Sequence, residues 1–423
     1  MKTKVDGSIL SYALVLMVIV AIILSSLILL SYYNQTIAIE YRIADRLRLN
    51  AESGINKLLV EGHNLNYGQS LKIDLYGEAE DSVLLKKSNW GLLDLYSAKA
   101  YNGSKIRTKK VLAGGFYRRH QAYALKLLNS NRPLCLVGYT KITGNVSLPR
   151  GGLKRGYVDG RHFIGDTLIR GIVSLSPDKF QLNEEIIKLN SLDSILNKIT
   201  DDQYDFQLLN EVQSSQIANS FHSPTGILYH KGNYVMEELQ LKGNLIVLID
   251  GSLIIGSSFE AEDVLIYAKT IYIESGSALK AQIIASDSLI VMPECTFGNP
   301  SVLAVLQTDH LNKPAYLDLG QNTSLEGNII YWNTTASKNQ YANLRIRKGS
   351  VIKGQIYSSG YIEMEGTLKG SLQAAHSLIR RPNGNYINHL LDVDLSYPAL
   401  DMQFVSMDIN KNNNPYKTIK CLR

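Results

Sequence analysis

Cysteine is scarce in this chain. The three cysteines, Cys135, Cys295 and Cys421, are odd in number, lie far apart and form no CxxC pair. A disulfide framework needs paired cysteines, and a zinc site needs a cluster of Cys or His, so neither is indicated. We therefore predict that these cysteines are small buried hydrophobic residues.

Motifs for catalysis and cofactor binding are also lacking. The eight histidines include no HExxH and no close pair, and no GxSxG, GxxxxGK[ST] or GxGxxG follows an expected strand. Asp408, Asn410 and Asn412 mimic the start of a calcium loop, but Ile419 stands where the bidentate Glu belongs. We predict no metal site, no cofactor, no small-molecule substrate and no catalytic residue.

Clustered carboxylates are few. Glu260, Glu262 and Asp263 fall close together in a β-rich stretch, and two carboxylates on one face could act as an acid/base pair. We interpret them instead as solvated corner residues. The aspartates at 201, 202, 205, 392 and 394 lie outside the repeats described below.

A strong excess of charge of one sign is missing too. The chain has 44 Lys and Arg against 38 Asp and Glu, a net charge of +6, which gives little support to nucleic-acid binding. The basic stretch PRGGLKRG at 149–156 lacks the Lys-Ser/Thr pair that holds phosphate and metal. We interpret it as a basic turn. The alternative is a patch for anionic lipid headgroups or acidic glycans, formed by Arg150, Lys154, Arg155, Arg161 and Arg170.

A long apolar run is present near the N-terminus. Residues 8–33 contain no charged residue, and at about 1.5 Å per residue a helix of this length spans a bilayer core of about 30 Å. The run is too long for the apolar region of a secretory signal peptide. We predict a retained transmembrane helix whose partner is membrane lipid. Lys2 and Lys4 nearly balance the arginines at 42, 46 and 48, so charge leaves the orientation open.

The residues after this run keep helical spacing. Between charged positions in 34–62, apolar side chains recur at helical intervals, as Ile37, Ile39, Ile43, Leu47, Ile55, Leu58 and Leu59. We predict an amphipathic helix that ends near Gly62.

The N-terminal segment resembles type IV minor pilins and pseudopilins over about the first 60 residues. The likeness is carried by a short leader, MKTKVDG, then SILSYALVLMVIVAIILSS, then a helix containing LNAESGINKLL. The resemblance implies a 1–7 leader cut after Gly7, with Ser8 as the mature N-terminus. It also implies a bacterial inner membrane, a body on the extracytoplasmic side and other pilin-like envelope proteins as partners. Tyr12 stands where major pilins carry a Glu, and an ordinary signal-anchor helix is the alternative.

The remainder is predicted to be mainly β. Short apolar segments broken by turn residues, such as the Asn102-Gly103 pair, predict a small β module over 63–140. The stretch 178–219 is polar, free of glycine and spaced like a helix, so we expect a helical insertion there. The final segment, 383–423, is expected to cap the β region.

A repeat of 18 residues marks the stretch 246–299. Small polar residues Ser252, Thr270 and Ser288 align just before the second apolar cluster of each row. The aligned apolar sets are Val247, Leu265 and Ile283; Leu248, Ile266 and Ile284; Leu253, Ile271 and Leu289; Ile254, Tyr272 and Ile290; and Ile255, Ile273 and Val291. Two short strands per row predict the coil of a β-solenoid, which we place at 141–382.

A second zone repeats less regularly, as EGNIIYW at 326–332, KGQIYSSG at 353–360 and KGSLQAAH at 369–376. The fragments TGNVSLPRGG and GDTLIRGIVSL are expected to be initial rungs. These repeats resemble those of bactofilins and other polymer-forming β-helical proteins, and a β-sandwich is the alternative.

The sequence therefore predicts a mainly β protein with an N-terminal transmembrane helix, an amphipathic extension, a β module and a β-solenoid with a helical insertion. The predicted function is a non-enzymatic, membrane-anchored structural or assembly protein of the bacterial cell envelope. The alternatives are an anchored carbohydrate-active enzyme and a glycan-binding adhesin built on the β-helix.

Overall fold

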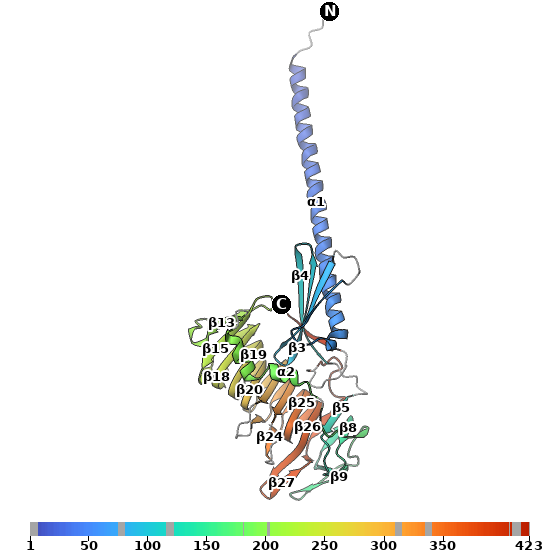
Figure 1. Cartoon of the computed structure of the whole chain (residues 1–423), viewed down its shortest axis with the longest axis vertical. Helices are drawn as coiled ribbons and strands as arrows, with labels where there is room; N and C mark the ends of the chain where they lie inside the picture. Colours follow the sequence, from blue (N-terminus) through green and yellow to red (C-terminus); the bar gives the residue numbers. More distant parts are fainter. Residues whose placement is uncertain are drawn as a thin grey trace, which may run out of the picture. The chain divides into compact units, whose positions relative to one another are not determined.

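The computed structural model describes residues 7–74, 81–115, 122–180, 182–200, 204–308, 315–334, 341–405, 407 and 416–422. The chain is mainly β with one long apolar helix at its N-terminus (Figure 1), which confirms the predicted fold class at this level. Its residues cluster into two compact units. The first comprises Met1–Lys57, Ser70–Lys86 and Ser97–Lys109, and the second comprises Leu58–Gln69, Lys87–Tyr96 and Lys110–Arg423.

Helix α1 runs from Gly7 to Glu61 without a break, and the 3-10 helix η1 follows at Gly62–Asn64. Residues 9–42 of α1 are all exposed. Beyond them, buried positions recur every three or four residues, at Leu47, Ala51 and Ile55, which is the spacing of one helical face. Helix α1 therefore has an exposed apolar half and a half that packs against protein.

That second half packs on an antiparallel sheet formed by β1 (Ser70–Ile73), β2 (Asp81–Trp90), β3 (Leu93–Asn102) and β4 (Lys105–Gly115). Two-residue turns join β2 to β3 and β3 to β4, as antiparallel neighbours allow. Gly54 lets the helix approach closely, because a Cβ there would lie 2.9 Å from Leu85 Cδ2 and 3.0 Å from Ala98 Cβ. Ion pairs join Lys105 to Glu40 at 2.7 Å and Lys109 to Glu52 at 3.2 Å.

The second unit holds the other strands and short helices. The first group comprises β5 (Tyr123–Leu127), β6 (Leu134–Val137), β7 (Lys141–Thr143), β8 (Asn145–Leu148), β9 (Leu153–Arg155), β10 (Tyr157–Val158), β11 (Arg161–His162) and β12 (Val173–Leu175). The middle group comprises α2 (Glu184–Leu189), α3 (Leu192–Leu196), η3 (Asn197–Thr200), β13 (Tyr204–Leu208), η4 (Leu209–Glu211), β14 (Gln216–Asn219), β15 (Thr225–Lys231), β16 (Tyr234–Met236), β17 (Gln240–Gly243), β18 (Leu245–Ile255), β19 (Glu260–Ile273) and β20 (Ala278–Val291). The last group comprises β21 (Thr296–Gln307), β22 (Tyr316–Leu319), β23 (Ser324–Asn333), β24 (Ala342–Ile346), β25 (Val351–Met364), β26 (Thr367–Arg381), β27 (Gly384–Ile387), β28 (His389–Leu391), β29 (Asp394–Ser396) and β30 (Tyr416–Leu422).

Most of these strands stack in parallel into a sheet system that closes on itself. Figure 1 shows the stack from β13 and β15 through β18, β19 and β20 to β25 and β26. Three ladders run along it. The first ladder joins β13, β15, β18, β19, β20, β21, β23, β25, β26, β5, β8 and β12. The second ladder joins β16, β18, β19, β20, β22, β24 and β25. The third ladder joins β14, β17, β19, β20, β21, β23, β25, β26, β29 and β7.

The 18-residue alignment holds for the second apolar cluster and slips in the first. Ser252 pairs with Thr270 and Thr270 with Ser288, as aligned, and the three following positions agree. In the first cluster Val247 pairs with Ile266, not with Leu265, and Ile266 pairs with Ile283. The middle row is displaced by one residue because the register shifts between Ala268 and Thr270 and between Ile249 and Ser252. Such irregularities insert a residue into one strand.

Successive side chains of these strands enter two different cores. Val247, Ile266 and Ile283 belong to the core inside the closed sheet. Their neighbours Leu248 and Tyr267 face outward into a second core, which is completed by residues of α2 and α3 and by the turn between β2 and β3. Burial on both faces explains why these strands are apolar throughout rather than alternating.

Glycines stack where the coil turns in the second repeat zone. Gly327 pairs with Gly354, and Gly354 pairs with Gly370, as the repeat predicted. Their φ angles are 157°, 150° and 156°, and a Cβ on Gly354 would lie 1.8 Å from the carbonyl oxygen of Gly327. Only glycine meets both conditions.

The structure differs from the expected domain order in three places. The stretch 178–219 holds the short helices α2 and α3 but also strands β13 and β14. The fragments expected as initial rungs, β8 and β12, instead extend the stack beyond its last repeat, because β5 pairs with β26. In the final segment β27, β28 and β29 pair with β26, β6 and β7, while β30 pairs with β4.

Candidate functional sites: an apolar helix and a charged ladder

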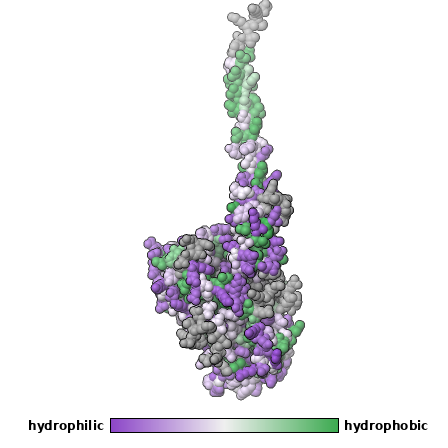
Figure 2. Space-filling view, in the orientation of Figure 1, coloured by the Kyte–Doolittle hydropathy of each residue, from purple (hydrophilic) through white to green (hydrophobic). Residues whose placement is uncertain are grey.

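The first candidate is the exposed apolar half of α1. The side chains of residues 9–33 are exposed, with Leu10 at 72% and Ile28 at 71%. Figure 2 shows apolar residues gathered over this part of the helix. Among the described residues it is the one helix long and apolar enough to cross a membrane. Contiguous apolar surface of this extent is a binding surface for a membrane or for protein.

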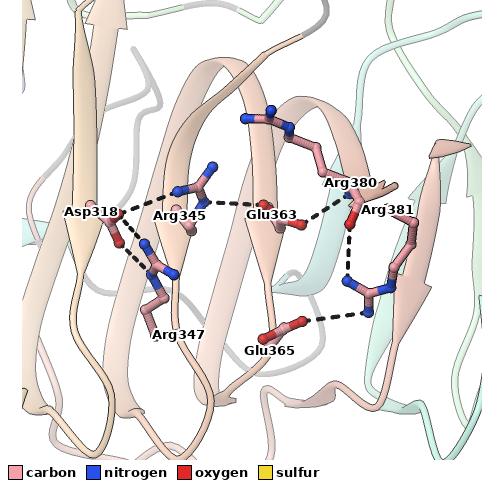
Figure 3. Close-up of polar contacts among 7 residues, drawn as sticks. All are labelled: Asp318, Arg345, Arg347, Glu363, Glu365, Arg380 and Arg381. Carbon is pink, nitrogen blue, oxygen red and sulfur yellow. Dashed lines mark hydrogen bonds and ion pairs between the residues drawn. The ribbon is translucent and has the colours of Figure 1, made fainter. Parts of the chain in front are cut away.

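The second candidate is a row of charged side chains that crosses neighbouring strands of the second ladder (Figure 3). Arg345 on β24 lies in register between Asp318 on β22 and Glu363 on β25. Its Nε donates to Glu363 at 3.1 Å, and its Nη1 donates to Asp318 at 3.4 Å. Opposite charges directly across strands stabilise the pairing. We call these residues, with Arg347, Glu365, Arg380 and Arg381, the charged ladder.

Arg347 and Arg381 make further contacts with carboxylates of the charged ladder. Arg347 donates two hydrogen bonds to Asp318, at 2.9 and 2.6 Å, and these bonds raise the pKa of Arg347. Arg381 pairs with Glu365 at 3.6 Å and with Asp159 at 3.4 Å. Each carboxylate of the charged ladder thus contacts at least one arginine.

An open groove of about 420 Å³ lies over the charged ladder, lined by Arg345, Ile346, Arg347, Glu363, Glu365, Arg380, Arg381 and Pro382. A smaller hollow of about 190 Å³ shares Arg345 with it and is lined by Tyr316 and Tyr341. The side chain of Arg380 points away from Glu363 in Figure 3, and its guanidinium lies 5.7 Å from the centre of the Tyr341 ring. We call the two hollows together the Arg–Tyr groove.

Two of the three carboxylates considered for acid/base chemistry in the sequence, Glu262 and Asp263, contact lysines. Glu262 contacts Lys242 at 2.6 Å, Lys420 at 3.1 Å and Lys280 at 3.7 Å. The hydrogen bond from Lys242 is the main cause that lowers the pKa of Glu262 to about 2. Asp263 contacts Lys420 at 2.5 Å. Glu262 is therefore a poor proton donor.

The five basic residues of the alternative patch are all exposed, but the structure spreads them over several elements. Lys154 and Arg155 are consecutive on β9, so their side chains leave opposite faces of the strand. Arg155 donates to the carbonyl of Asp166 at 3.5 Å, and Arg161 pairs with Asp392 at 2.5 Å. Arg150 lies in the turn after β8, and Arg170 forms an isolated bridge with Thr143. Two of the five charges are therefore already engaged within the protein.

The remaining residues singled out in the sequence are the possible cleavage site, the calcium-like residues, two aspartates and the cysteines. Gly7 is the first residue of α1, and the leader before it lies outside the described residues. The calcium-like residues Asp408, Asn410 and Asn412 also lie outside them, as do Asp201 and Asp202. Among the described residues, no group of three or more His, Cys, Asp or Glu could hold a metal ion. The three cysteines are unpaired; Cys295 is buried and Cys421 is exposed.

The sequence analysis did not predict the charged ladder, although the spacing of its residues contains a signal for it. Arg345 and Arg347 precede Glu363 and Glu365 by 18 residues each, the period already found in the apolar rows. Extending the period from apolar to charged residues would have aligned opposite charges on adjacent strands.

No protein-family model matches the chain, and no curated protein matches it. Among solved structures, the chain is similar to the crystal structure of the competence-associated pilin ComZ from Thermus thermophilus. The sequence identity is 9%, the TM-score is 0.21, and the match covers 85% of this chain and 87% of that chain. A TM-score this low does not show a shared fold.

Proposed function

We propose that the protein is a non-enzymatic, membrane-anchored structural or assembly protein of the bacterial cell envelope. The observation that carries this proposal is helix α1, whose side chains from 9 to 42 are exposed while Leu47, Ala51 and Ile55 are buried against a sheet. One continuous helix thus joins an apolar segment to a folded unit. The apolar segment stays exposed in water unless lipid or another helix covers it.

The same helix supports a pilin-like role. The N-terminal resemblance implies cleavage between Gly7 and Ser8 and assembly with other pilin-like proteins through the apolar half of α1. It also implies an inner-membrane location with the body outside the cytoplasm. Packing of the second half of α1 on an antiparallel sheet fits this role, because it leaves the first half available to lipid or to neighbouring helices.

The body supports a structural role. We interpret the closed parallel ladders as a β-solenoid, since each coil hydrogen-bonds to the next and buries an inward row of apolar residues. Such a stack is stiff and presents long lateral faces to partners. The carboxylates of the charged ladder are held by arginines, which favours this role over an enzymatic one. The likeness to bactofilins stays a hypothesis.

Membrane fractionation tests the anchor. The full chain is expected in the membrane fraction and to resist alkaline extraction. Ile19→Lys combined with Ile23→Lys should shift it toward the soluble fraction, since each Lys at the centre of a bilayer costs about 2.5–3.5 kcal/mol. Leu49→Lys is the matched control, because Leu49 is exposed on the same helix outside the apolar run. An uncleaved wild-type chain recovered wholly in the soluble fraction would overturn the proposal.

Mass spectrometry of the mature N-terminus tests the pilin-like part separately. A chain that begins at Ser8 supports pilin-type processing. A membrane-bound chain that begins at Met1 contradicts processing and leaves a plain signal anchor.

A further inference from the structure

The Arg–Tyr groove lies in the second unit and has no role in the proposed anchoring. It crosses β22, β24, β25 and β26, which are neighbours in the parallel stack. At about 4.8 Å between neighbouring strands, the groove spans about 14 Å along the stack. We propose that this groove binds an acidic polysaccharide whose sugar units carry carboxylates.

Arg380 supplies the charge for such a ligand. In the part of the chain that the structure describes, its guanidinium makes no ion pair with a carboxylate, unlike those of Arg345, Arg347 and Arg381. Its backbone N–H donates to Glu363 Oε1 at 3.0 Å, and its guanidinium lies beside the Tyr341 ring. Arg380 lines the groove, and a carboxylate bound there can accept two of its guanidinium N–H groups.

Tyr341 and Tyr316 supply the apolar faces that sugar rings need. The two side chains are 49% and 36% exposed, and both line the smaller hollow. A tyrosine offers a flat apolar ring and a hydroxyl together. Because Arg345 lines both hollows, a linear ligand can contact the tyrosines and Arg380 at once.

The mixture of charges in the groove favours a carboxylated sugar over other anions. Glu365 is half-buried and lines the groove together with Glu363, so a ligand with dense negative charge is repelled there. Sugar hydroxyls both donate and accept hydrogen bonds, and the groove offers acceptors on the glutamates and donors on the arginines. The groove therefore suits singly charged units rich in hydroxyls.

The charged ladder keeps this surface ready to bind. Arg345 is held from both sides by Asp318 and Glu363, and Arg347 is held by two hydrogen bonds to Asp318. Side chains fixed before binding lose little conformational freedom when the ligand arrives.

The test is calorimetric titration of the full-length protein in detergent with polygalacturonate. Wild type is expected to bind polygalacturonate, to bind its fully methyl-esterified form much more weakly, and to lose affinity as salt rises. Arg380→Gln and Tyr341→Ala should each weaken binding at least about tenfold, because each removes a charge-assisted bond or a stacking face. Arg170→Gln is the matched control, since it removes an exposed arginine outside the groove. It should leave the affinity within about twofold.

Three outcomes would overturn the proposal. One is no binding of polygalacturonate by a wild-type protein whose circular dichroism shows it folded. Another is equal affinity for the free and the methyl-esterified polymer, or for poly-glutamate of similar length. The third is a loss of binding in Arg170→Gln that equals the loss in Arg380→Gln, which would assign the ligand to the alternative basic patch that includes Arg170.

Discussion

Lys87 and Asp94 form a buried pair of opposite charges in the second unit. Its side chain is 6% exposed and that of Asp94 is 4% exposed, with 3.5 Å between Lys87 Nζ and Asp94 Oδ2. The ammonium also donates to the carbonyl of Gly62 at 3.2 Å, and Tyr67 donates to Asp94 at 2.6 Å. Burial raises the pKa of Asp94. The pair therefore depends on its partners to offset the loss of hydration.

Replacing Lys87 by Met should lower the free energy of unfolding by about 3–5 kcal/mol, because it leaves a buried carboxylate without a counter-charge. Urea denaturation followed by circular dichroism measures this change. The double variant Lys87→Met, Asp94→Leu removes both charges and should recover a large part of the loss. A single variant as stable as wild type, or a double variant less stable than the single, would contradict this account.

At the scale of the strands, the stacked glycines Gly327, Gly354 and Gly370 allow close approach of neighbouring strands at one corner of the parallel sheet. Gly354→Ala should lower the free energy of unfolding by about 3 kcal/mol or more, since the new Cβ meets a carbonyl and φ is positive. Gly298→Ala on β21 is the control, because a Cβ there has its nearest contact at 3.8 Å. Thermal unfolding compares the two. Equal shifts in Tm would show that stacking does not make Gly354 special.

In the apolar rows, the 18-residue period predicts the strand register correctly in the second cluster and wrongly in the first. The second cluster aligned correctly because Ser252, Thr270 and Ser288 mark a fixed point in each row. The first cluster has no polar marker, and both of its faces are buried. A slip of one residue exchanges inward and outward side chains, but between two apolar faces it leaves no trace in the composition.

In the second unit, strands that lie side by side are often far apart in the sequence. Strand β5 joins β26 and strand β30 joins β4, so segments remote in sequence complete the same sheets. Repeats predict neighbours one period apart, and they carry no information about pairings across hundreds of residues. The long helix and the β class were therefore predictable from local patterns. The closure of the stack was not, because it depends on pairings between distant residues such as those of β5 with β26. The charged ladder, by contrast, joins residues about one period apart, such as Arg345 and Glu363.

Gln282 closes one of these distant contacts, between β20 and the turn from β2 to β3. Its Nε2 donates to the carbonyl of Trp90 at 2.7 Å, and its Oε1 accepts from the backbone N–H of Leu92 at 2.8 Å. The side chain is 4% exposed. A glutamine thus satisfies two backbone groups of a segment 190 residues away in sequence that would otherwise be buried without a partner.

Gln282→Leu should lower the free energy of unfolding by about 2–4 kcal/mol, because it leaves a buried N–H and a buried carbonyl without hydrogen bonds. Hydrogen exchange of the Leu92 amide measures the local effect, and urea denaturation measures the global one. Gln240→Leu is the control, since Gln240 is an exposed residue in the parallel stack on β17. Unchanged protection of the Leu92 amide in Gln282→Leu would show that the turn is held by its apolar contacts, chiefly the edge-on packing of Trp90 against Phe221 at 5.1 Å between ring centres.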